Sequence, residues 1–145
     1  MRLTEITHEF VEFVPAELEE GKLYISLEYA GAVHLCACGC RTKVVTPLSP
    51  AEWQLIFDGD SVSLYPSIGN WQFPCQSHYW IRRNVIDWAR RWSQREIERG
   101  QQRDEADLAH YYEGRLASSQ KPESALPAAR ESVTARIKRH LRVKT

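Results

Sequence analysis

Short runs in which hydrophobic and polar residues alternate fill much of the first part of the chain. They occur at 8–14, 22–29 and 43–46. Alternation is typical of a half-buried β-strand, because successive side chains of a strand face opposite sides of the sheet. Pro15 and Pro47 follow the first and third runs, and proline ends a strand because it has no N–H to give to the sheet. The pattern therefore predicts a mostly β domain.

Two hairpins are predicted in the second part of this region. Asp58-Gly59-Asp60 lies between two alternating runs, which is the strongest short-range hairpin signal. Arg83-Asn84 separates two shorter runs and predicts a second hairpin. Residues 66–71, which read Pro-Ser-Ile-Gly-Asn-Trp, predict a turn. Residues 49–52, Ser-Pro-Ala-Glu, predict a capping box that opens a short helical turn.

The composition changes after Trp88. The following residues are rich in Arg, Glu, Gln and Ala, which favour helix. We expect a first helix that ends at Gly100 and a second at 104–116. A linker at 117–122 and a basic amphipathic segment at 131–143 would follow.

The charge of the chain divides at nearly the same place. Residues 1–80 hold 4 Lys and Arg against 10 Asp and Glu, a net charge of −6, whereas residues 81–145 hold 15 against 9, a net charge of +6. Such a division suggests two segments with different roles. We predict a mostly β domain at 1–88 and a basic helical extension at 89–145.

The length and hydropathy of the chain limit the class of protein to which it can belong. A chain of 145 residues has room for one ordinary domain and an appendage. No apolar run approaches the roughly 20 residues that span a bilayer. The first five residues are followed by acidic positions rather than by the unbroken apolar stretch of a secretory signal. We therefore expect a cytoplasmic protein with no membrane partner.

The cysteines of the acidic half form the most specific constellation, and they are Cys36, Cys38, Cys40 and Cys75. A disulfide fits poorly, because cytosolic thiols stay reduced and Cys-x-Cys closes a strained ring. Four buried free thiols are the alternative, but three cysteines within five residues argue against it. Tetrahedral zinc prefers thiolates, and Gly39 would let the backbone fold close to the ion. His34 and His78 are alternative nitrogen ligands.

Serine and histidine residues lie beside these cysteines. Hydrolysis by a serine requires a base within hydrogen-bond reach. We prefer Ser67 with His78, because Cys75 and the zinc would bring their segments together. Ser77 with His34 is the alternative pair, tied to the same metal. The competing interpretation is that Ser67 caps a turn and His78 satisfies a hydrogen bond in the core.

Aromatic and basic residues suggest further roles. The tryptophans are expected to build the core around the metal, and they are Trp53, Trp71, Trp80, Trp88 and Trp92. A basic tail can contact nucleic acid, a partner or the acidic body of the same chain. The acidic body argues against a nucleic-acid adaptor.

The run from His34 to Trp88 resembles a bacterial family known as a domain of unknown function. Its pattern reads His-Leu-Cys-x-Cys-Gly-Cys, Pro-Leu-x-Pro-x-x-Trp, Asp-Gly, Pro-Ser-Ile-Gly-Asn-Trp and Cys-x-Ser-His-Tyr-Trp-Ile, and this chain matches each part. Members look like companions of bacterial ubiquitin-like conjugation genes, beside proteins that resemble E1 and E2 enzymes and ubiquitin-like modifiers. The resemblance implies a peptidase that processes or removes the modifier. The basic tail after Trp88 and the Arg83-Asn84 turn depart from the shared pattern.

Together these observations predict an α+β protein, a small zinc-stabilised antiparallel β domain with a C-terminal helical extension. The expected function is that of a serine-type peptidase with a structural zinc, acting on a ubiquitin-like protein or its conjugates. Its partners would be that modifier or E1- and E2-like conjugation enzymes. The alternative is a non-catalytic zinc-binding interaction module of the same system.

Overall fold

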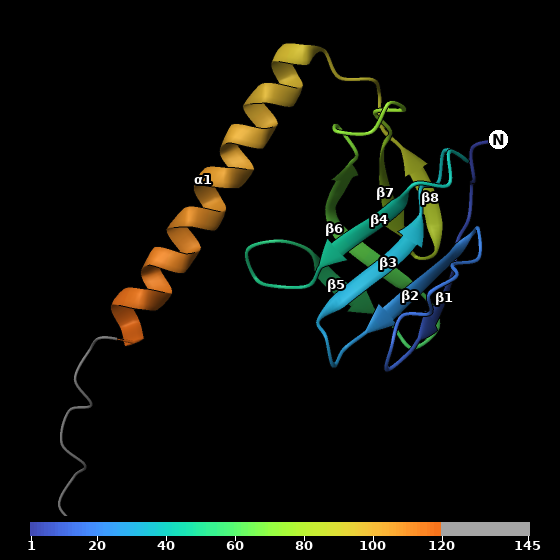
Figure 1. Cartoon of the computed structure of the whole chain (residues 1–145), viewed down its shortest axis with the longest axis horizontal. Coiled ribbons are helices and arrows are strands. Elements are labelled where there is room, and N and C mark those ends of the chain that lie inside the picture. The colour runs from blue at the N-terminus through green and yellow to red at the C-terminus, as the bar shows by residue number, and fades with distance from the viewer. Residues whose placement is uncertain (120–145) are drawn as a thin grey trace, which may run out of the picture. The chain divides into compact units, whose positions relative to one another are not determined.

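The computed structural model describes residues 1–119, which form eight strands and one helix (Figure 1). The strands are β1 (Thr7–Phe10), β2 (Lys22–Ser26), β3 (Gly31–Leu35), β4 (Lys43–Pro47), β5 (Gln54–Phe57), β6 (Val62–Gly69), β7 (His78–Arg82) and β8 (Val85–Trp88), and the helix is α1 (Gln94–Ser119). The segment predicted at 131–143 lies outside the described residues. The α+β class with a C-terminal helix is confirmed.

The strands form two four-stranded sheets in simple chain order, β1-β2-β3-β4 and β5-β6-β7-β8. Neighbouring strands are antiparallel, except that β1 pairs with β2 in parallel. Two isolated bridges, Glu5 with Val85 and Leu48 with Trp53, join the sheets near their edges. The predicted antiparallel domain is therefore correct in all but one pairing.

One hydrophobic core is shared by both sheets, which lie against each other in Figure 1. Leu23 and Ile25 of β2 are fully buried, and so are Leu64 of β6 and Ile81 of β7. Full burial of an aliphatic side chain contributes about 1.5–3 kcal/mol. The alternation read from the sequence is clearest in β4, where Val45 is exposed between two buried neighbours.

Both predicted hairpins are present. Asp58 Oδ1 accepts backbone N–H groups from Asp60 at 3.0 Å and Ser61 at 2.6 Å, and these bonds lower the pKa of Asp58 to about 2. In the second hairpin Arg83 and Asn84 have φ values of 51° and 65°. This left-handed pair suits a two-residue turn, and asparagine tolerates it better than most residues other than glycine.

The turn predicted at residues 66–71 was wrong for most of its length. Strand β6 continues through this segment to Gly69, and its register with β7 shifts between Leu64 and Ile68. An interruption of the ladder of this kind accommodates Pro66, which has no N–H to donate. The capping contact predicted at 49–52 forms, with Ser49 Oγ donating to Glu52 Oε2 at 3.0 Å, but it closes only a turn.

The prediction of two helices separated at Gly100 was also wrong, because α1 is continuous. It begins after Ser93, whose N–H and hydroxyl both donate to the Glu96 carboxylate, at 2.8 and 2.9 Å. This is a capping box. Gly100 is buried within the helix rather than ending it. No helix within residues 1–119 has the length and hydropathy needed to cross a membrane.

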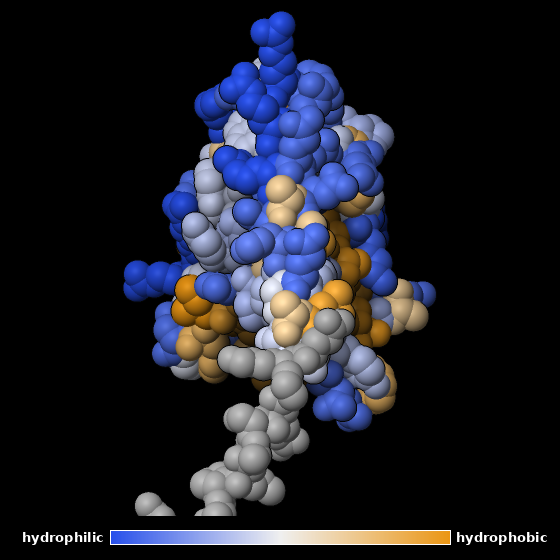
Figure 2. All heavy atoms as spheres, turned by 90° about the vertical axis from the view of Figure 1, so that its left-hand side faces the viewer, coloured by the Kyte–Doolittle hydropathy of each residue, from blue (hydrophilic) through white to orange (hydrophobic). Residues whose placement is uncertain are grey.

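Residues 1–111 form one compact unit, so the first turns of α1 belong with the sheets. The rest of the chain forms a second unit, of which only residues 112–119 are described. Ile97 is 4% exposed, which shows that the start of α1 is packed. Hydrophilic residues cover most of the face seen in Figure 2. That residues 1–88 fold without the helix stays a prediction.

Candidate metal centre and active site

Four cysteine sulfur atoms converge at one end of the two sheets. The Sγ atoms of Cys36, Cys38, Cys40 and Cys75 all lie within 4.8 Å of one another. The Cys36–Cys38, Cys40–Cys75 and Cys36–Cys75 pairs are separated by 3.4, 3.8 and 3.9 Å. Sulfur ligands about 2.3 Å from a tetrahedral zinc would be about 3.8 Å apart. The four residues therefore fit a tetrahedral metal site, and neither histidine takes part in the cluster.

The backbone brings these sulfur atoms together from both sheets. Three of them lie in the tight connection from β3 to β4, and Cys75 lies in the connection from β6 to β7. Gly39 has a φ of 89°, and its N–H donates to the Cys36 carbonyl at 3.1 Å. A Cβ at this position would also lie 2.9 Å from the Met1 nitrogen. The expectation that Gly39 allows a close turn is confirmed.

A hydrogen-bonded network lies behind the buried sulfur of Cys36. Ser77 Oγ is 3.0 Å from Cys36 Sγ, and Asn70 Nδ2 donates to Ser77 Oγ at 2.8 Å. Burial raises the pKa of Cys36. A cation bound beside this thiol would displace its proton at neutral pH.

The histidine of the alternative catalytic pair is enclosed in the core. His34 is fully buried, and its Nε2 lies 2.8 Å from the Tyr79 hydroxyl. Burial lowers the pKa of His34 to about 4, which keeps the ring neutral. Within the described residues no hydrogen bond joins His34 to Ser77, which instead contacts Cys36 and Asn70. The structure does not bring the alternative pair together.

The preferred catalytic pair, Ser67 and His78, lies on two neighbouring strands of the second sheet. Ser67 Oγ of β6 is 2.9 Å from His78 Nε2 of β7. His78 is 5% exposed, and burial, followed by the positive charge of Arg90, lowers its pKa. The ring is therefore neutral near pH 7, and Nε2 can accept the proton of the Ser67 hydroxyl.

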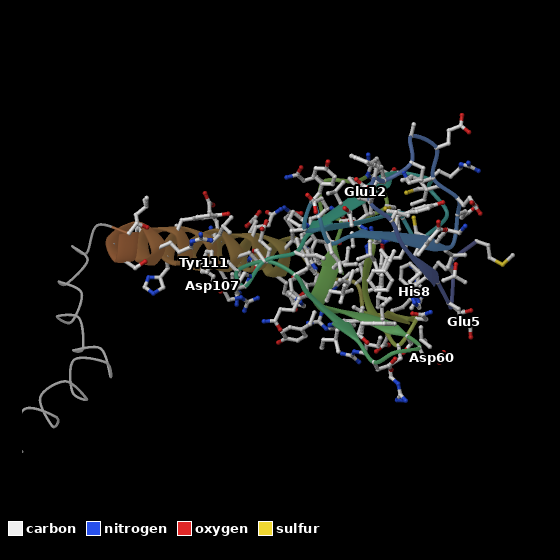
Figure 3. All side chains as sticks on the ribbon, turned by 90° about the horizontal axis from the view of Figure 1, so that it is seen from below. Glu5, His8, Glu12, Asp60, Asp107 and Tyr111 are labelled. Atoms are coloured by element: carbon white, nitrogen blue, oxygen red, sulfur yellow. The ribbon has the colours of Figure 1, made fainter. Side chains whose placement is uncertain are left out.

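A cleft of about 480 Å³ opens beside Ser67 and His78. Residues 51–53, the end of β6 and the first turns of α1 line it. Its aromatic lining consists of Trp53, Trp71 and Trp92. Its carboxylates are Glu52, Asp104, Glu105 and Asp107, of which Figure 3 labels Asp107, against one guanidinium, that of Arg103. The lining is thus apolar and acidic.

Three tryptophans surround His78 rather than the metal, which differs from the expected core role. The ring centroids of Trp71, Trp80 and Trp92 lie 4.9, 5.4 and 4.7 Å from that of His78. Trp92 was not recognised as a site residue from the sequence. The signals that point to it are the Ser93-x-x-Glu96 capping box, which fixes the helix start, and a glycine at position 100 inside a helix.

These features define a small β domain with a four-cysteine cluster that fits a metal site and with a serine–histidine pair in a cleft. A family model described as bacterial ubiquitination-like system serine protease (BubE) matches residues 10–89. The chain belongs to this family, and the resemblance inferred from its motifs is confirmed. Its partners therefore belong to a ubiquitination-like pathway. No curated protein and no solved structure matches the chain at a significant level.

Proposed function

We propose that this protein is a serine-type peptidase that processes or removes a bacterial ubiquitin-like modifier, with Ser67 as nucleophile and His78 as general base. The observation that carries the proposal is the 2.9 Å distance between Ser67 Oγ and His78 Nε2. This is the separation that a nucleophile and its base require. Both residues lie inside the segment matched by the serine protease family.

The reaction follows from the protonation states of the pair. His78 Nε2 accepts the Ser67 proton as Oγ attacks the carbonyl carbon of the scissile bond, which gives a tetrahedral intermediate and an imidazolium. The imidazolium then donates that proton to the leaving amine as the bond to nitrogen breaks, which leaves an acyl ester on Ser67. His78 then accepts a proton from a water molecule as that water attacks the ester carbonyl carbon. When the second tetrahedral intermediate collapses, the imidazolium returns the proton to Ser67 Oγ, which releases the acid and restores Ser67 and neutral His78.

The metal of the four-cysteine site is proposed to be zinc with a structural role. Thiolates are preferred zinc ligands, and four protein ligands leave no position open for substrate or water. Bound there, zinc would supply folding free energy rather than a reacting group. Cys75 precedes His78 by three residues, so this site fixes the connection that leads into β7.

The cleft favours a substrate segment that carries positive charge. Four carboxylates line it against one guanidinium. Complementary charge speeds encounter and selects among partners. We propose that a basic segment of the ubiquitin-like protein, or of an E1- or E2-like enzyme that carries it, enters the cleft. The expected location of this reaction is the cytoplasm.

The test uses a probe that does not depend on knowing the substrate. A fluorophosphonate should add to the wild-type protein once, at Ser67, and the adduct is located by intact and peptide mass. Ser67→Ala should abolish the adduct and His78→Gln should slow its formation by on the order of 100-fold or more. Ser63→Ala, which changes another serine of β6, is the matched control and should react normally.

The same variants are then mixed with the ubiquitin-like protein encoded nearby, extended at its C-terminus by a short peptide. Release of the peptide by wild type and by Ser63→Ala, but not by Ser67→Ala, supports the peptidase. Absence of both the adduct and the cleavage in metal-loaded wild-type protein overturns it. The interaction module then replaces the peptidase, and the observation that favours the module is the lack of a carboxylate partner for His78 Nδ1 in residues 1–119.

A further inference from the structure

His78 carries a buried nitrogen that the proposed reaction leaves unexplained. Its Nδ1 is buried and has no hydrogen-bond partner among the described residues. If Nε2 accepts the Ser67 proton, the neutral ring must carry its own proton on Nδ1. In a Ser-His-Asp triad a carboxylate accepts that N–H and fixes both tautomer and orientation. Here another group must hold the ring.

Tryptophan rings occupy the surroundings of His78. The Trp92 ring lies nearly perpendicular to the imidazole, at 79° and 4.7 Å between centroids, and Trp71 makes a similar contact at 63° and 4.9 Å. Trp71 and Trp92 also stack on each other, at 5.0 Å and 19°. The three rings therefore form one contacting group, in which the imidazole cannot turn without displacing an indole.

Two glycines make room for this group. A Cβ on Gly69 would overlap the indole of Trp71. A Cβ on Gly100 would lie 2.9 Å from Cζ3 of Trp92, which is closer than real side chains approach. Glycine within a helix is less stable than alanine, so a buried glycine there usually has a packing reason. Trp92 supplies that reason, because it fits against α1 only where position 100 lacks a side chain.

We propose that Trp92, held by Gly100 of α1, is a positioning residue that keeps the His78 ring directed at Ser67 in place of the carboxylate of a triad. This inference rests on the proposed function of Ser67 and His78. It goes beyond the family match, because Trp92 and all of α1 lie outside residues 10–89. The helix thereby becomes part of the catalytic machinery rather than an appendage.

The chemistry of an indole suits this role in both protonation states of His78. An aromatic face accepts an N–H weakly, so an Nδ1–H directed at one of these indole rings would favour the tautomer with the proton on Nδ1. When the ring takes the Ser67 proton it becomes a cation, and tryptophan attracts a cation within about 6 Å of its ring centre more strongly than the other aromatic rings do. The charged groups around His78 and the cleft are Glu52, Arg90, Arg103, Asp104, Glu105 and Asp107.

The test compares two glycine variants of the full chain. Gly100→Ala should displace Trp92, whereas Gly114→Ala is the matched control, because a Cβ at position 114 meets nothing within 4 Å. Trp92→Ala removes the ring directly, and Trp92→Phe restores an aromatic face. Nitrogen-15 NMR at pH 8 reports the tautomer of His78, whose signal is assigned with His78→Gln. This readout needs no substrate.

We expect wild type, Gly114→Ala and Trp92→Phe to hold the proton on Nδ1, and Gly100→Ala and Trp92→Ala to give a mixture of tautomers. The first-order rate constant of inactivation by fluorophosphonate, or the kcat for the peptide, should fall on the order of tenfold in the last two. The half-saturating concentration of the probe, the KM for the peptide and the metal content should stay unchanged. An unchanged tautomer in both Trp92→Ala and Gly100→Ala overturns the proposal, as does an equal effect of Gly114→Ala. If the tautomer shifts in these variants but Ser67 of the wild-type protein never reacts with fluorophosphonate or peptide, the positioning by Trp92 is upheld and the peptidase is refuted instead.

Discussion

The sulfur atoms of Cys36 and Cys75 lie 3.9 Å apart although the two residues belong to connections in different sheets. Cys36 directly follows β3, and Cys75 lies between β6 and β7. A bound cation would join the sheets at this point and shield four thiolates from one another. The connection that carries Cys75 leads directly to His78, so the proposed structural and catalytic roles share one segment.

The metal site predicts a large loss of stability when a ligand is removed. Cys75→Ser should reduce bound zinc from about one equivalent to much less and lower the free energy of unfolding by several kcal/mol, because a structural metal contributes folding free energy directly. Elemental analysis and thermal unfolding measure the two effects. Wild-type protein that carries no zinc when prepared without chelator would contradict the assignment.

Ser77 is predicted to act on the metal rather than on the substrate. Its hydroxyl lies 3.0 Å from Cys36 Sγ, and groups that contact ligands in this way typically alter metal affinity about 10–100-fold. Ser77→Ala should therefore weaken zinc binding in a competition with a chelator. With zinc in excess, its reaction with fluorophosphonate should match that of wild type. A variant that keeps its metal and loses the reaction would instead favour the Ser77–His34 pair.

Much of the fold is local and could be predicted from the sequence. Alternation of hydrophobic and polar residues predicts β4. Asp58-Gly59-Asp60 predicts the hairpin between β5 and β6, because an Asx turn and a glycine are enough to reverse the chain there. The strand through Pro66 was missed, since a proline reads as a stop unless the interruption of the ladder that accommodates it is known. Gly100 was taken as a helix end because the ring that fills its space lies outside the helix.

The candidate site also contains residues that the sequence predicts and a contact that it does not. The four cysteines could be identified because three are clustered, whereas His34 and His78 remained alternative ligands until the structure placed them outside the cluster. Ser67 and His78 could be proposed because Cys75 lies close to His78 in the chain. The contact of His78 with Trp92 depends on how α1 begins and packs. The capping box at Ser93 and the glycine at position 100 mark the helix start and a close approach, but they do not identify His78 as the neighbour.

The second hairpin offers a stability test that separates backbone strain from hydrogen bonding. Asn84 has a φ of 65°, and its Oδ1 accepts the Val62 N–H at 2.9 Å. Asn84→Gly keeps the backbone conformation but loses the hydrogen bond, which should cost about 1 kcal/mol. Asn84→Ala loses both and should cost about 2–3 kcal/mol in urea unfolding. Equal costs for the two variants would show that the left-handed backbone is unstrained.

The pH dependence of the reaction follows from His78. Its pKa lies below the ordinary value of 6.5 because of burial and the positive charge of Arg90. Only the neutral ring accepts the Ser67 proton, so kcat/KM should rise with pH along a limb whose midpoint lies below 6.5 and then level off. Arg90→Gln should move this midpoint upward, while Arg91→Gln serves as the control. A midpoint above 6.5 in wild type would contradict the environment described for His78.

Two truncated proteins test the predicted boundary between residues 88 and 89 together with the role of Trp92. A protein that ends at Ser119 retains all of α1 and should match the full chain in metal content, unfolding and reaction with fluorophosphonate. A protein that ends at Ala89 retains every cysteine ligand, Ser67 and His78, so it should still bind about one zinc and unfold cooperatively.

The shorter protein loses the packing of Ile97, which is 4% exposed, and the contact of Trp92 with His78. Its stability should fall by about 2–4 kcal/mol from this lost burial. Its kcat for the peptide should fall as in Trp92→Ala while the KM for the peptide stays similar, because the nucleophile and base remain but the imidazole is no longer held. Loss of the metal or of cooperative unfolding would show that the boundary is wrong and that α1 belongs to the core. Full activity with zinc bound would show that the first 89 residues suffice and that Trp92 does not position His78.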